Sequence, residues 1–337
     1  MTDTLLEING LAVLFPGLER DVQAVRGVGL SVRRGEVMGL VGESGSGKSV
    51  TALACLGLVP PPGRVSGSIR LDGREVVGAS EAECKRIRGG VAAMIFQNPG
   101  KAMNPFFTIG RQLIDAVSNV RRVDRGQAQR LVLDALHSVR IADPKLALQK
   151  YPHQVSGGQL QRAMIAMALA CEPQLLIADE PTTALDVTIQ AQVIVLLRDL
   201  ARERGLTVLF ITHDLGVVGS LCDRLAVMYA GRIVEQGTTD ALFGAPAHPY
   251  TANLLRAVPM LGRGRTALTQ IAGTVPNMAN PPPGCAFHPR CPSASPICSH
   301  AAPAMLAVGP DRTAACHNPI EVAPAASLGT GPGASPR

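Results

Sequence analysis

The most informative segment of the sequence is Gly42-Glu43-Ser44-Gly45-Ser46-Gly47-Lys48-Ser49. It fits the pattern Gly-x-x-x-x-Gly-Lys-Ser/Thr, with an apolar stretch at 37–41 before it and a helical pattern at 50–58 after it. Glycines let backbone N–H groups converge on phosphate oxygens, and a helix N-terminus adds unpaired donors. We therefore expect Lys48 to reach the β- and γ-phosphates of a nucleotide and Ser49 to coordinate Mg²⁺. The alternative, an ordinary Gly/Ser loop, does not account for the strand before it and the helix after it.

The segments around this loop predict an α/β fold. Short apolar runs that suit strands buried on both faces lie at 37–41, 91–96, 175–178 and 208–212. Such runs are typical of a parallel sheet wrapped by helices. Segments 68–71 and 226–235 carry hairpin-type turn residues, Asp72-Gly73 and Ala230-Gly231, and predict an antiparallel flank. Residues from about 104 to 170 are mostly helical and predict a subdomain inserted between core strands.

Two acids follow the apolar run at 175–178, where α/β sheets place their ligand chemistry. We expect Asp179 to hold Mg²⁺ directly or through water, and Glu180 to orient and polarise the attacking water. The alternative is an acidic pair that caps a helix on a surface turn. The loop at 42–49 makes that alternative less economical.

A second anion-binding helix start is predicted at Ser156-Gly157-Gly158-Gln159, which precedes a helical stretch at 160–171. One nucleotide does not need two phosphate-binding helix ends. The economical explanation is that the second loop serves a nucleotide held by another subunit.

The composition bounds the class of protein. The 337 residues allow two domains, and 46% hydrophobic against 17% charged residues excludes a mainly disordered chain. No uninterrupted apolar stretch of about 18 residues is present, and the first ten residues lack the pattern of a signal peptide. We expect a cytosolic protein, or one that sits on a membrane without crossing it.

The C-terminal part differs in composition. Prolines become frequent after about residue 245 and leave little room for regular structure, and 321–337 is predicted to be a disordered tail. We expect one domain at 1–243 and an extension at 244–320. Four scattered cysteines read most simply as small core residues in a reducing compartment: Cys55, Cys84, Cys171 and Cys222. The other four lie within 32 residues of the extension: Cys285, Cys291, Cys298 and Cys316.

These motifs resemble the ATP-binding subunits of ABC transporters over residues 5 to about 243. Six motifs stand in the family's order: the Walker A loop (42–49), the Q-loop around Gln97, the signature (155–159), Walker B (175–180), the D-loop (184–186) and a switch histidine, His213. Val155 is a mild departure, since the family more often has Leu before the signature serine. The family also stacks adenine on an aromatic side chain upstream of Walker A, and Phe15 is the credible candidate, with Ala24 or Val25 as alternatives.

The resemblance implies how these residues act on ATP. It implies a head-to-tail dimer with ATP between the Walker A loop of one subunit and the signature of the other. His213 would contact the γ-phosphate and help to hold Glu180 and the water. Gln97 would sense Mg²⁺ and the water and relay their presence to the membrane subunits.

Three further segments resemble the ATPases of dipeptide, oligopeptide and nickel importers. They are the region around the Q-loop (96–99 and 103–105), the run His248-Pro249-Tyr250-Thr251, and the segment with the clustered cysteines, which begins at Gly284. The resemblance implies import of peptides, with two permease subunits, an external binding protein and a second, related ATPase as partners. It places the chain peripherally on the cytoplasmic face of the inner membrane. A heterodimer is then favoured over a homodimer.

The four clustered cysteines, with gaps of five, six and seventeen residues, can close around one centre. The gaps are wider than those of common zinc knuckles, and four thiolates suit a 4Fe–4S cluster, to which the resemblance also points. Zinc is an alternative to the cluster, because three histidines that could bind it lie in the same segment: His288, His300 and His317. Four unligated thiols are a third possibility.

Other functions are weighed against import of peptides. An importer of nickel or another small solute shares most of the same motifs. A non-transport ABC ATPase acting on nucleic acid or ribosomes would suit the net charge of +6. Against it, the chain has one nucleotide-binding core and no basic run with interleaved aromatics, so we expect no nucleic-acid partner.

Overall fold

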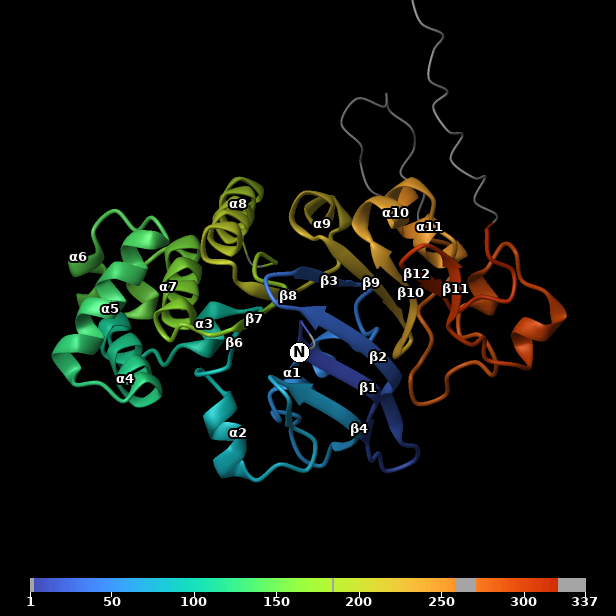
Figure 1. The fold of residues 1–337 in the computed structure, drawn as a ribbon, viewed down its shortest axis with the longest axis horizontal. Helices are drawn as coiled ribbons and strands as arrows, with labels where there is room; N and C mark the ends of the chain where they lie inside the picture. Colours follow the sequence, from blue (N-terminus) through green and yellow to red (C-terminus); the bar gives the residue numbers. More distant parts are fainter. Residues whose placement is uncertain (1–2, 184, 258–270, 321–337) are drawn as a thin grey trace, which may run out of the picture.

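The computed structural model describes residues 3–183, 185–257 and 271–320. An eight-stranded sheet runs through the middle of the molecule in the order β11-β12-β10-β9-β3-β8-β7-β6 (Figure 1). Its strands are β3 (Val37–Val41), β6 (Ala92–Ile95), β7 (Leu175–Asp179), β8 (Thr207–Thr212), β9 (Arg224–Tyr229), β10 (Arg232–Thr238), β11 (Leu306–Gly309) and β12 (Arg312–Ala314). The predicted α/β class is confirmed.

The centre of this sheet is parallel, as the apolar runs predict. Strand β3 pairs with β8 and β9, and β7 pairs with β6 and β8, all in parallel. Both faces of β3 are buried: Val37 and Val41 pack into one core cluster, and Met38 and Leu40 pack into the other. Because neither face meets water, the strand is apolar throughout.

The antiparallel flank is also confirmed. Strand β9 turns at Ala230-Gly231 into the antiparallel β10. The second predicted hairpin joins β4 (Arg64–Leu71) to β5 (Arg74–Glu75) through Asp72-Gly73. Asp72 and Ala230 both have positive φ, as such tight turns require.

The hairpin β4–β5 belongs to a second, four-stranded antiparallel sheet of order β2-β1-β4-β5. Its two longest strands, β1 (Thr4–Phe15) and β2 (Val22–Arg33), were not predicted individually from the sequence. They pack their apolar side chains against α1 (Lys48–Cys55) and the main sheet in one core cluster.

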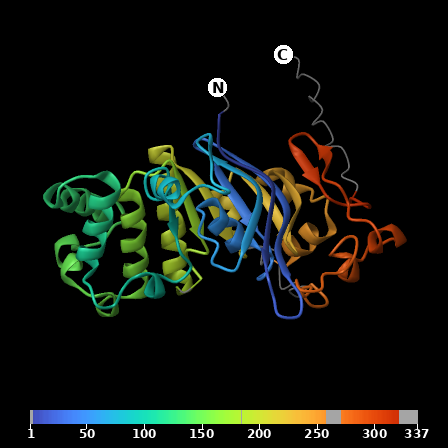
Figure 2. The same ribbon diagram turned by 90° about the horizontal axis from the view of Figure 1, so that it is seen from below.

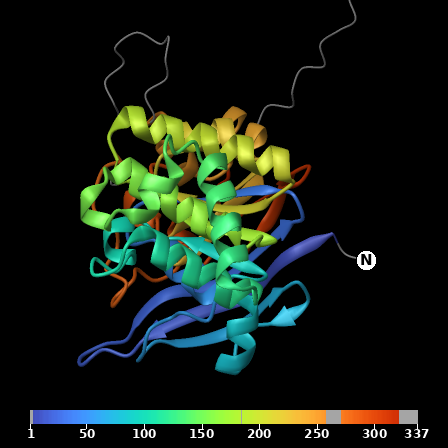
Figure 3. The same cartoon turned by 90° about the vertical axis from the view of Figure 1, so that its left-hand side faces the viewer.

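Helices form the other layers. The predicted helical subdomain contains α4 (Ile109–Arg121), α5 (Arg125–Ser138), α6 (Pro144–Gln149), η1 (Pro152–Gln154) and α7 (Gly157–Ala170). It lies at the opposite end of the molecule from the C-terminal segment, and the view along the long axis shows it in front of both sheets (Figures 2 and 3). The remaining helices are α2 (Glu81–Ile87), α3 (Pro99–Ala102), α8 (Val187–Arg204), α9 (Leu215–Leu221), α10 (Thr239–Gly244) and α11 (Pro249–Arg256).

The proline-rich extension has more regular structure than the sequence led us to expect. It forms the short helices η2 (His288–Arg290) and η3 (Pro296–Ser299) and the strands β11 and β12. Strand β12 pairs antiparallel with β10, so residues on both sides of the predicted boundary at 243/244 share one sheet. The predicted tail, 321–337, lies outside the described residues.

In the part of the chain that the structure describes, no helix combines the length and the apolarity needed to cross a bilayer.

Candidate nucleotide-binding site

The glycine-rich loop connects the buried end of β3 to the first turn of α1. Gly47 is the residue before the helix, with φ of 103°, and a Cβ there would collide with the carbonyl oxygen of Ala24. A Cβ on Gly42 would likewise collide with the carbonyl oxygen of Met228. The loop can therefore lie this close to the neighbouring strands only because these two residues are glycines.

A cavity of about 650 Å³ opens over this loop. Its lining brings together most of the residues that the sequence predicts for nucleotide binding: Gly42, Glu43, Ser44, Gly45, Gly47, Lys48, Ser49, Gln97, Glu180 and His213. Leu254 and Met278, from beyond the predicted core domain, also line it. Sequence reasoning missed both, because an apolar residue in an extension carries no local signal of a ligand.

Lys48 lies inside the loop. Its Nζ donates hydrogen bonds to the carbonyl oxygens of Gly42 at 2.8 Å and Glu43 at 3.0 Å. Burial lowers the pKa of Lys48, and the carboxylates of Glu180 and Asp179 oppose that shift. The ammonium is thus held at the loop by carbonyl dipoles, where the phosphates of a nucleotide would bind.

The predicted Mg²⁺ ligands Ser49 and Asp179 face each other. Ser49 Oγ donates to Asp179 Oδ1 at 3.0 Å. Burial raises the pKa of Asp179, while the Ser49 hydrogen bond and Lys48 act in the opposite direction. A hydroxyl beside a carboxylate at the start of a phosphate-binding helix is a donor set that fits a hard divalent cation, so these residues suit Mg²⁺.

The Glu180 carboxylate is the centre of a hydrogen-bond network. Gln97 Nε2 donates to its Oε2 at 2.8 Å, Thr183 Oγ1 donates to the same oxygen at 2.9 Å, and His213 Nδ1 lies 3.2 Å from its Oε1. Burial opposes ionisation, but the hydrogen bonds from His213 and Thr183 outweigh it, and the pKa of Glu180 falls below its ordinary value. Sequence reasoning missed Thr183, although its place three residues after Glu180 in the same turn was visible.

The backbone at Glu180 is itself unusual. Its φ is 45°, in the left-handed region that non-glycine residues seldom adopt, and its N–H donates to the carbonyl of Ile211 on β8 at 2.9 Å. The sheet therefore fixes the direction in which this side chain leaves β7. A strained conformation that the surrounding structure holds in place is typical of functional sites.

The signature residues lie apart from this cavity. Ser156 begins α7 with a reciprocal capping box: its Oγ accepts from Gln159 N at 3.3 Å, and Gln159 Oε1 accepts from Ser156 N at 3.3 Å. None of Ser156, Gly157, Gly158 and Gln159 lines the loop cavity within the described residues. In the D-loop, Asp186 caps α8 by accepting from Ile189 N, and Ala184 lies outside the described residues.

Phe15, the residue predicted to stack on adenine, lies near the loop cavity's strands but is not part of the cavity's lining, so its role stays a prediction. Phe15 ends β1 opposite Val22 and packs against the second core cluster, close to Gly63. Among the described residues, Val22 and Ala24 line the loop cavity and Phe15 does not. Val25 points into the core and is 1% exposed. Of the two alternatives to Phe15, Ala24 is the one that reaches the site.

The two groups of cysteines differ as the sequence predicts. Cys55, Cys84, Cys171 and Cys222 are buried. Burial raises the pKa of Cys55 to about 12 and of Cys171 to about 11, which makes both thiols inert. In the extension, burial raises the pKa of Cys285, Cys291 and Cys316, and neighbouring cysteines of the same group add to each shift.

Comparisons with known proteins agree with this geometry. Residues 25–183 match the model of the ABC transporter family, and residues 234–298 match the C-terminal region of oligopeptide/dipeptide transporters. A probable peptide ABC transporter ATP-binding protein of Sinorhizobium fredii is 49% identical over 95% of this chain and 96% of its own length. The oligopeptide transport ATP-binding protein of Salmonella typhimurium is 45% identical over 95% of both chains.

The chain belongs to the ATP-binding proteins of peptide ABC transporters. Solved structures of ABC ATPases have the same core. A dimeric ATP-binding cassette, MJ0796, bound to ADP and phosphate superimposes with a TM-score of 0.61 at 25% identity, over 69% of this chain and 98% of that one. The cbiO1 protein of Clostridium perfringens superimposes with a TM-score of 0.61 at 28% identity, over 72% of this chain and 92% of that one.

Proposed function

We propose that this ABC protein is the subunit that binds and hydrolyses ATP to power the import of di- or oligopeptides through a membrane permease. The observation that carries the proposal is the Glu180 network. Three segments far apart in the sequence place Gln97, Thr183 and His213 on one carboxylate, in the cavity that also contains Lys48 and Ser49. The C-terminal region of the oligopeptide/dipeptide type, at 234–298, supports peptides as the substrate.

In this proposal each side chain has a task. The N–H groups of the loop and the Lys48 ammonium bind the phosphates, and Ser49 with Asp179 would hold Mg²⁺, which neutralises charge on them. The ionised Glu180 carboxylate orients a water molecule for attack and draws its proton. Gln97 and His213 hold that carboxylate from two sides, and His213 is exposed enough to reach the γ-phosphate.

We also propose that the site is completed by a second ATPase subunit. The signature helix α7 begins at an exposed Ser156 that does not line its own chain's cavity. Its unpaired N–H groups suit the γ-phosphate of a nucleotide on the facing subunit. A related but different ATPase is the proposed partner, together with two permease subunits and an external binding protein, at the cytoplasmic face of the inner membrane.

Transport by the reconstituted complex tests this function. The chain and its genomic neighbours among permeases and ATPases are reconstituted in vesicles with ATP inside, and the binding protein and labelled peptide are added outside. We expect uptake of peptide that stops when the chain carries Glu180→Gln. Uptake of Ni²⁺ without peptide would replace the proposed substrate, and co-purification with ribosomal RNA in place of a permease would overturn transport itself.

A 4Fe–4S cluster in the extension is the second part of the proposal. Burial is the main cause that raises the pKa of Cys316 to about 11, and the nearby thiolates of Cys285, Cys291 and Cys298 add to it. Cys298 Sγ lies 3.5 Å from Ser295 Oγ and 3.7 Å from Asn318 Nδ2, so donors surround the sulfur.

The wide gaps between these cysteines in the sequence are the ground for proposing a cluster over one zinc ion. Zn–S bonds of about 2.3 Å need the sulfurs within about 4 Å of one another. Among the described residues, no group of three or more His, Cys, Asp or Glu side chains has the arrangement to hold a single metal ion. The choice of a cluster therefore rests on ligand chemistry, because four thiolates in one short segment suit a 4Fe–4S centre.

Metal analysis after anaerobic purification tests the cluster. We expect brown protein with about four irons and four sulfides per chain. Cys316→Ser should lose the iron, whereas the control Cys84→Ser, at a buried cysteine on α2, should keep it. One zinc per chain without iron would replace the cluster with a zinc site, and absence of any metal would leave four unligated thiols.

A further inference from the structure

A buried arginine, together with Tyr250, connects the extension to the ATP-binding loop. The Arg290 side chain is 5% exposed. Its Nη1 donates to Glu43 Oε2 at 2.8 Å and its Nη2 donates to Glu43 Oε1 at 3.0 Å. Two parallel hydrogen bonds between a guanidinium and a carboxylate are the strongest geometry for such a pair. Glu43 is the second residue of the Gly42–Ser49 loop, so this ion pair joins the extension to the nucleotide site.

The remaining donors of Arg290 fix its position. Nε donates to the carbonyl of Ala272 at 2.9 Å, Nη2 also donates to the carbonyl of Ile271 at 3.3 Å, and Nη1 donates to Tyr229 Oη at 3.3 Å. The guanidinium is thus oriented from the extension and from β9 at once. It has little freedom to turn away from Glu43.

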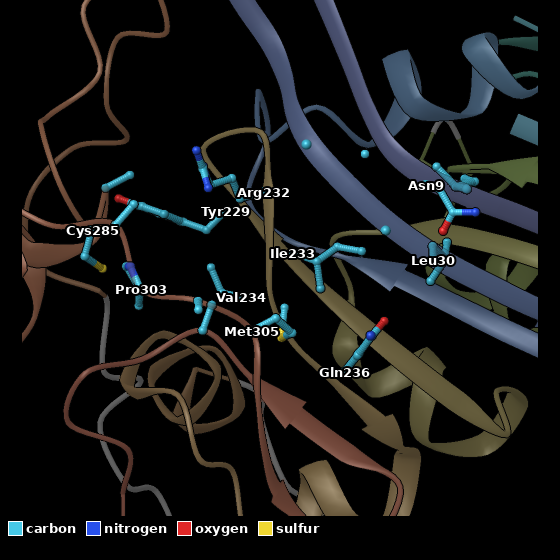
Figure 4. Close-up of a pocket in the computed structure, with 18 of the residues that line it drawn as sticks. Asn9, Leu30, Tyr229, Arg232, Ile233, Val234, Gln236, Cys285, Pro303 and Met305 are labelled. Atoms are coloured by element: carbon cyan, nitrogen blue, oxygen red, sulfur yellow. The ribbon is translucent and has the colours of Figure 1, made fainter. Parts of the chain in front are cut away.

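A cavity and a cluster of aromatic rings lie beside the ion pair of Arg290 and Glu43. A cavity of about 600 Å³ separates other parts of the extension from β1, β2 and β10, and Tyr229 and Cys285 lie along one wall of it (Figure 4). Beside this gap, the rings of Tyr229, Tyr250 and Phe287 pack with centroid separations of 4.5 to 5.3 Å. The aromatic cluster and Arg290 therefore form a bridge between the extension and the loop.

Glu43 transmits this contact to the phosphate-binding backbone. Its N–H donates to Tyr250 Oη at 2.9 Å, and its carbonyl accepts from Lys48 Nζ at 3.0 Å. The carboxylate, the N–H and the carbonyl of one loop residue are each held by a different partner. A change at the carboxylate therefore alters the orientation of the peptide groups next to Lys48.

We propose that Arg290 is a positioning residue for ATP binding: through Glu43 it holds the first turn of the glycine-rich loop in the conformation that receives the phosphates. The inference rests on the ATPase function proposed above and adds a dependence of the ATP site on the extension. Arg290 lies in η2, where His288 N donates to the Cys285 carbonyl at 2.9 Å and Cys291 N donates to the His288 carbonyl at 3.3 Å. The same turn thus carries two of the clustered cysteines and the arginine.

Equilibrium binding of MgATP to the full chain tests the proposal. Arg290→Ala should raise the Kd for MgATP about tenfold or more, because it leaves the Glu43 carboxylate without its charged partner. Arg290→Lys keeps the charge but not the paired hydrogen bonds and should fall in between. Glu43→Gln should weaken binding by a similar factor, and adding Arg290→Ala to it should cause little further loss, since the two residues act through each other.

Arg312→Ala is the matched control. Arg312 is also buried and anchors the extension, by donating to the carbonyls of Ala241 and Val308, but it does not touch the loop. We expect its Kd for MgATP to stay within about twofold of wild type. In the assembled transporter, Arg290→Lys should raise the KM for ATP with little change in kcat, a split that a merely structural role would not produce.

Three outcomes would overturn the proposal. The first is normal MgATP affinity in folded Arg290→Ala or in Arg290→Lys. The second is an equal loss of MgATP affinity in Arg312→Ala, which would show that Arg290 only holds the extension in place. The third is full additivity of Glu43→Gln and Arg290→Ala. Failure of the wild-type chain to bind MgATP at all would instead refute the ATPase function itself.

Discussion

The imidazole Nδ1 of His213 lies 3.2 Å from the Glu180 carboxylate, although the two residues directly follow different strands of the main sheet. Strands β7 and β8 are parallel neighbours, so their carboxyl ends meet at one edge. Gln97 approaches the other carboxylate oxygen from the segment after β6. Three adjacent strands thus deliver the three groups, and the order of strands in the sheet brings them together.

Glu180→Gln should retain ATP binding and lower hydrolysis about 100-fold or more, because the amide cannot accept the proton of the attacking water. The variant keeps the size of the side chain, and Lys48 and the loop N–H groups still bind the phosphates. Steady-state hydrolysis by the assembled complex and equilibrium binding of MgATP measure the two effects. Glu203→Gln, on the exposed face of α8, is the control. Retention of half the normal turnover by Glu180→Gln would refute the role of the carboxylate.

Lys48→Ala should produce the opposite pattern, a loss of nucleotide binding itself. The ammonium is held over the loop by the carbonyls of Gly42 and Glu43, and its removal takes a positive charge away from the phosphates. We expect the Kd for MgATP to rise about tenfold or more, from the worth of a hydrogen bond to a charged group. Titration with MgATP measures it, with Lys145→Ala on the exposed face of α6 as the control. Unchanged affinity would contradict the assignment.

The sequence is a good guide to the parallel core and to the residues at its edge. A strand such as β3 is buried on both faces and must be apolar throughout. Its run of apolar residues can therefore be recognised as a strand from the sequence alone. The loop, Asp179 and Glu180 follow such strands directly. Gln97 and His213 come from the family resemblance, and the structure places both against Glu180.

Other features depend on tertiary contacts that no local pattern carries. The alternation of apolar and polar residues along β1 and β2 is broken where the register shifts around Leu11. For this reason the sequence pattern did not predict these two long strands. The pairing of β12 with β10 and the ion pair between Glu43 and Arg290 join segments that are far apart in the chain. Phe15 as the residue that stacks on adenine comes from the family resemblance and stays a prediction, because its side chain lies beside Gly63 and nothing in the ligand-free fold places an adenine against it.

Acid should destabilise the protein through His248, which caps α11 and accepts from Tyr250 N at 3.0 Å. Burial lowers the pKa of His248 to about 4. The unfolded chain binds a proton near its ordinary value of about 6.5, so below that pH the unfolded state binds more protons than the folded state. The stability that this neutral histidine provides is complete above pH 6.5 and is lost as the pH falls toward 4.

His248→Asn separates this effect from general acid denaturation. The Asn side-chain oxygen can accept the same N–H and does not titrate. Between pH 7 and pH 5 the wild type should lose about 2 kcal/mol of unfolding free energy more than the variant. Urea unfolding curves at both pH values measure the difference. Equal losses in the two proteins would show that His248 is not the group responsible.

Ser156 should act on the nucleotide of the facing subunit. Ser156→Arg removes the capping box of α7 and places a bulky cation where we expect the partner's γ-phosphate. Because Ser156 does not line its own chain's cavity, MgATP binding by the isolated chain should stay within about twofold of wild type. Ser80→Arg is the matched control, since Ser80 is exposed and forms the same capping box on α2. Hydrolysis by the assembled complex should fall with Ser156→Arg and persist with Ser80→Arg.

A combined variant assigns the effect to the partner's site. In a complex of a Lys48→Ala chain with a wild-type partner ATPase, the remaining hydrolysis takes place on the partner's own loop. The partner's nucleotide then depends on the signature helix of the Lys48→Ala chain, which begins at Ser156. Adding Ser156→Arg to that same chain should abolish the remaining hydrolysis, while adding Ser80→Arg should not. If Ser156→Arg left this hydrolysis intact, or abolished MgATP binding by the isolated chain, the action in trans would be refuted.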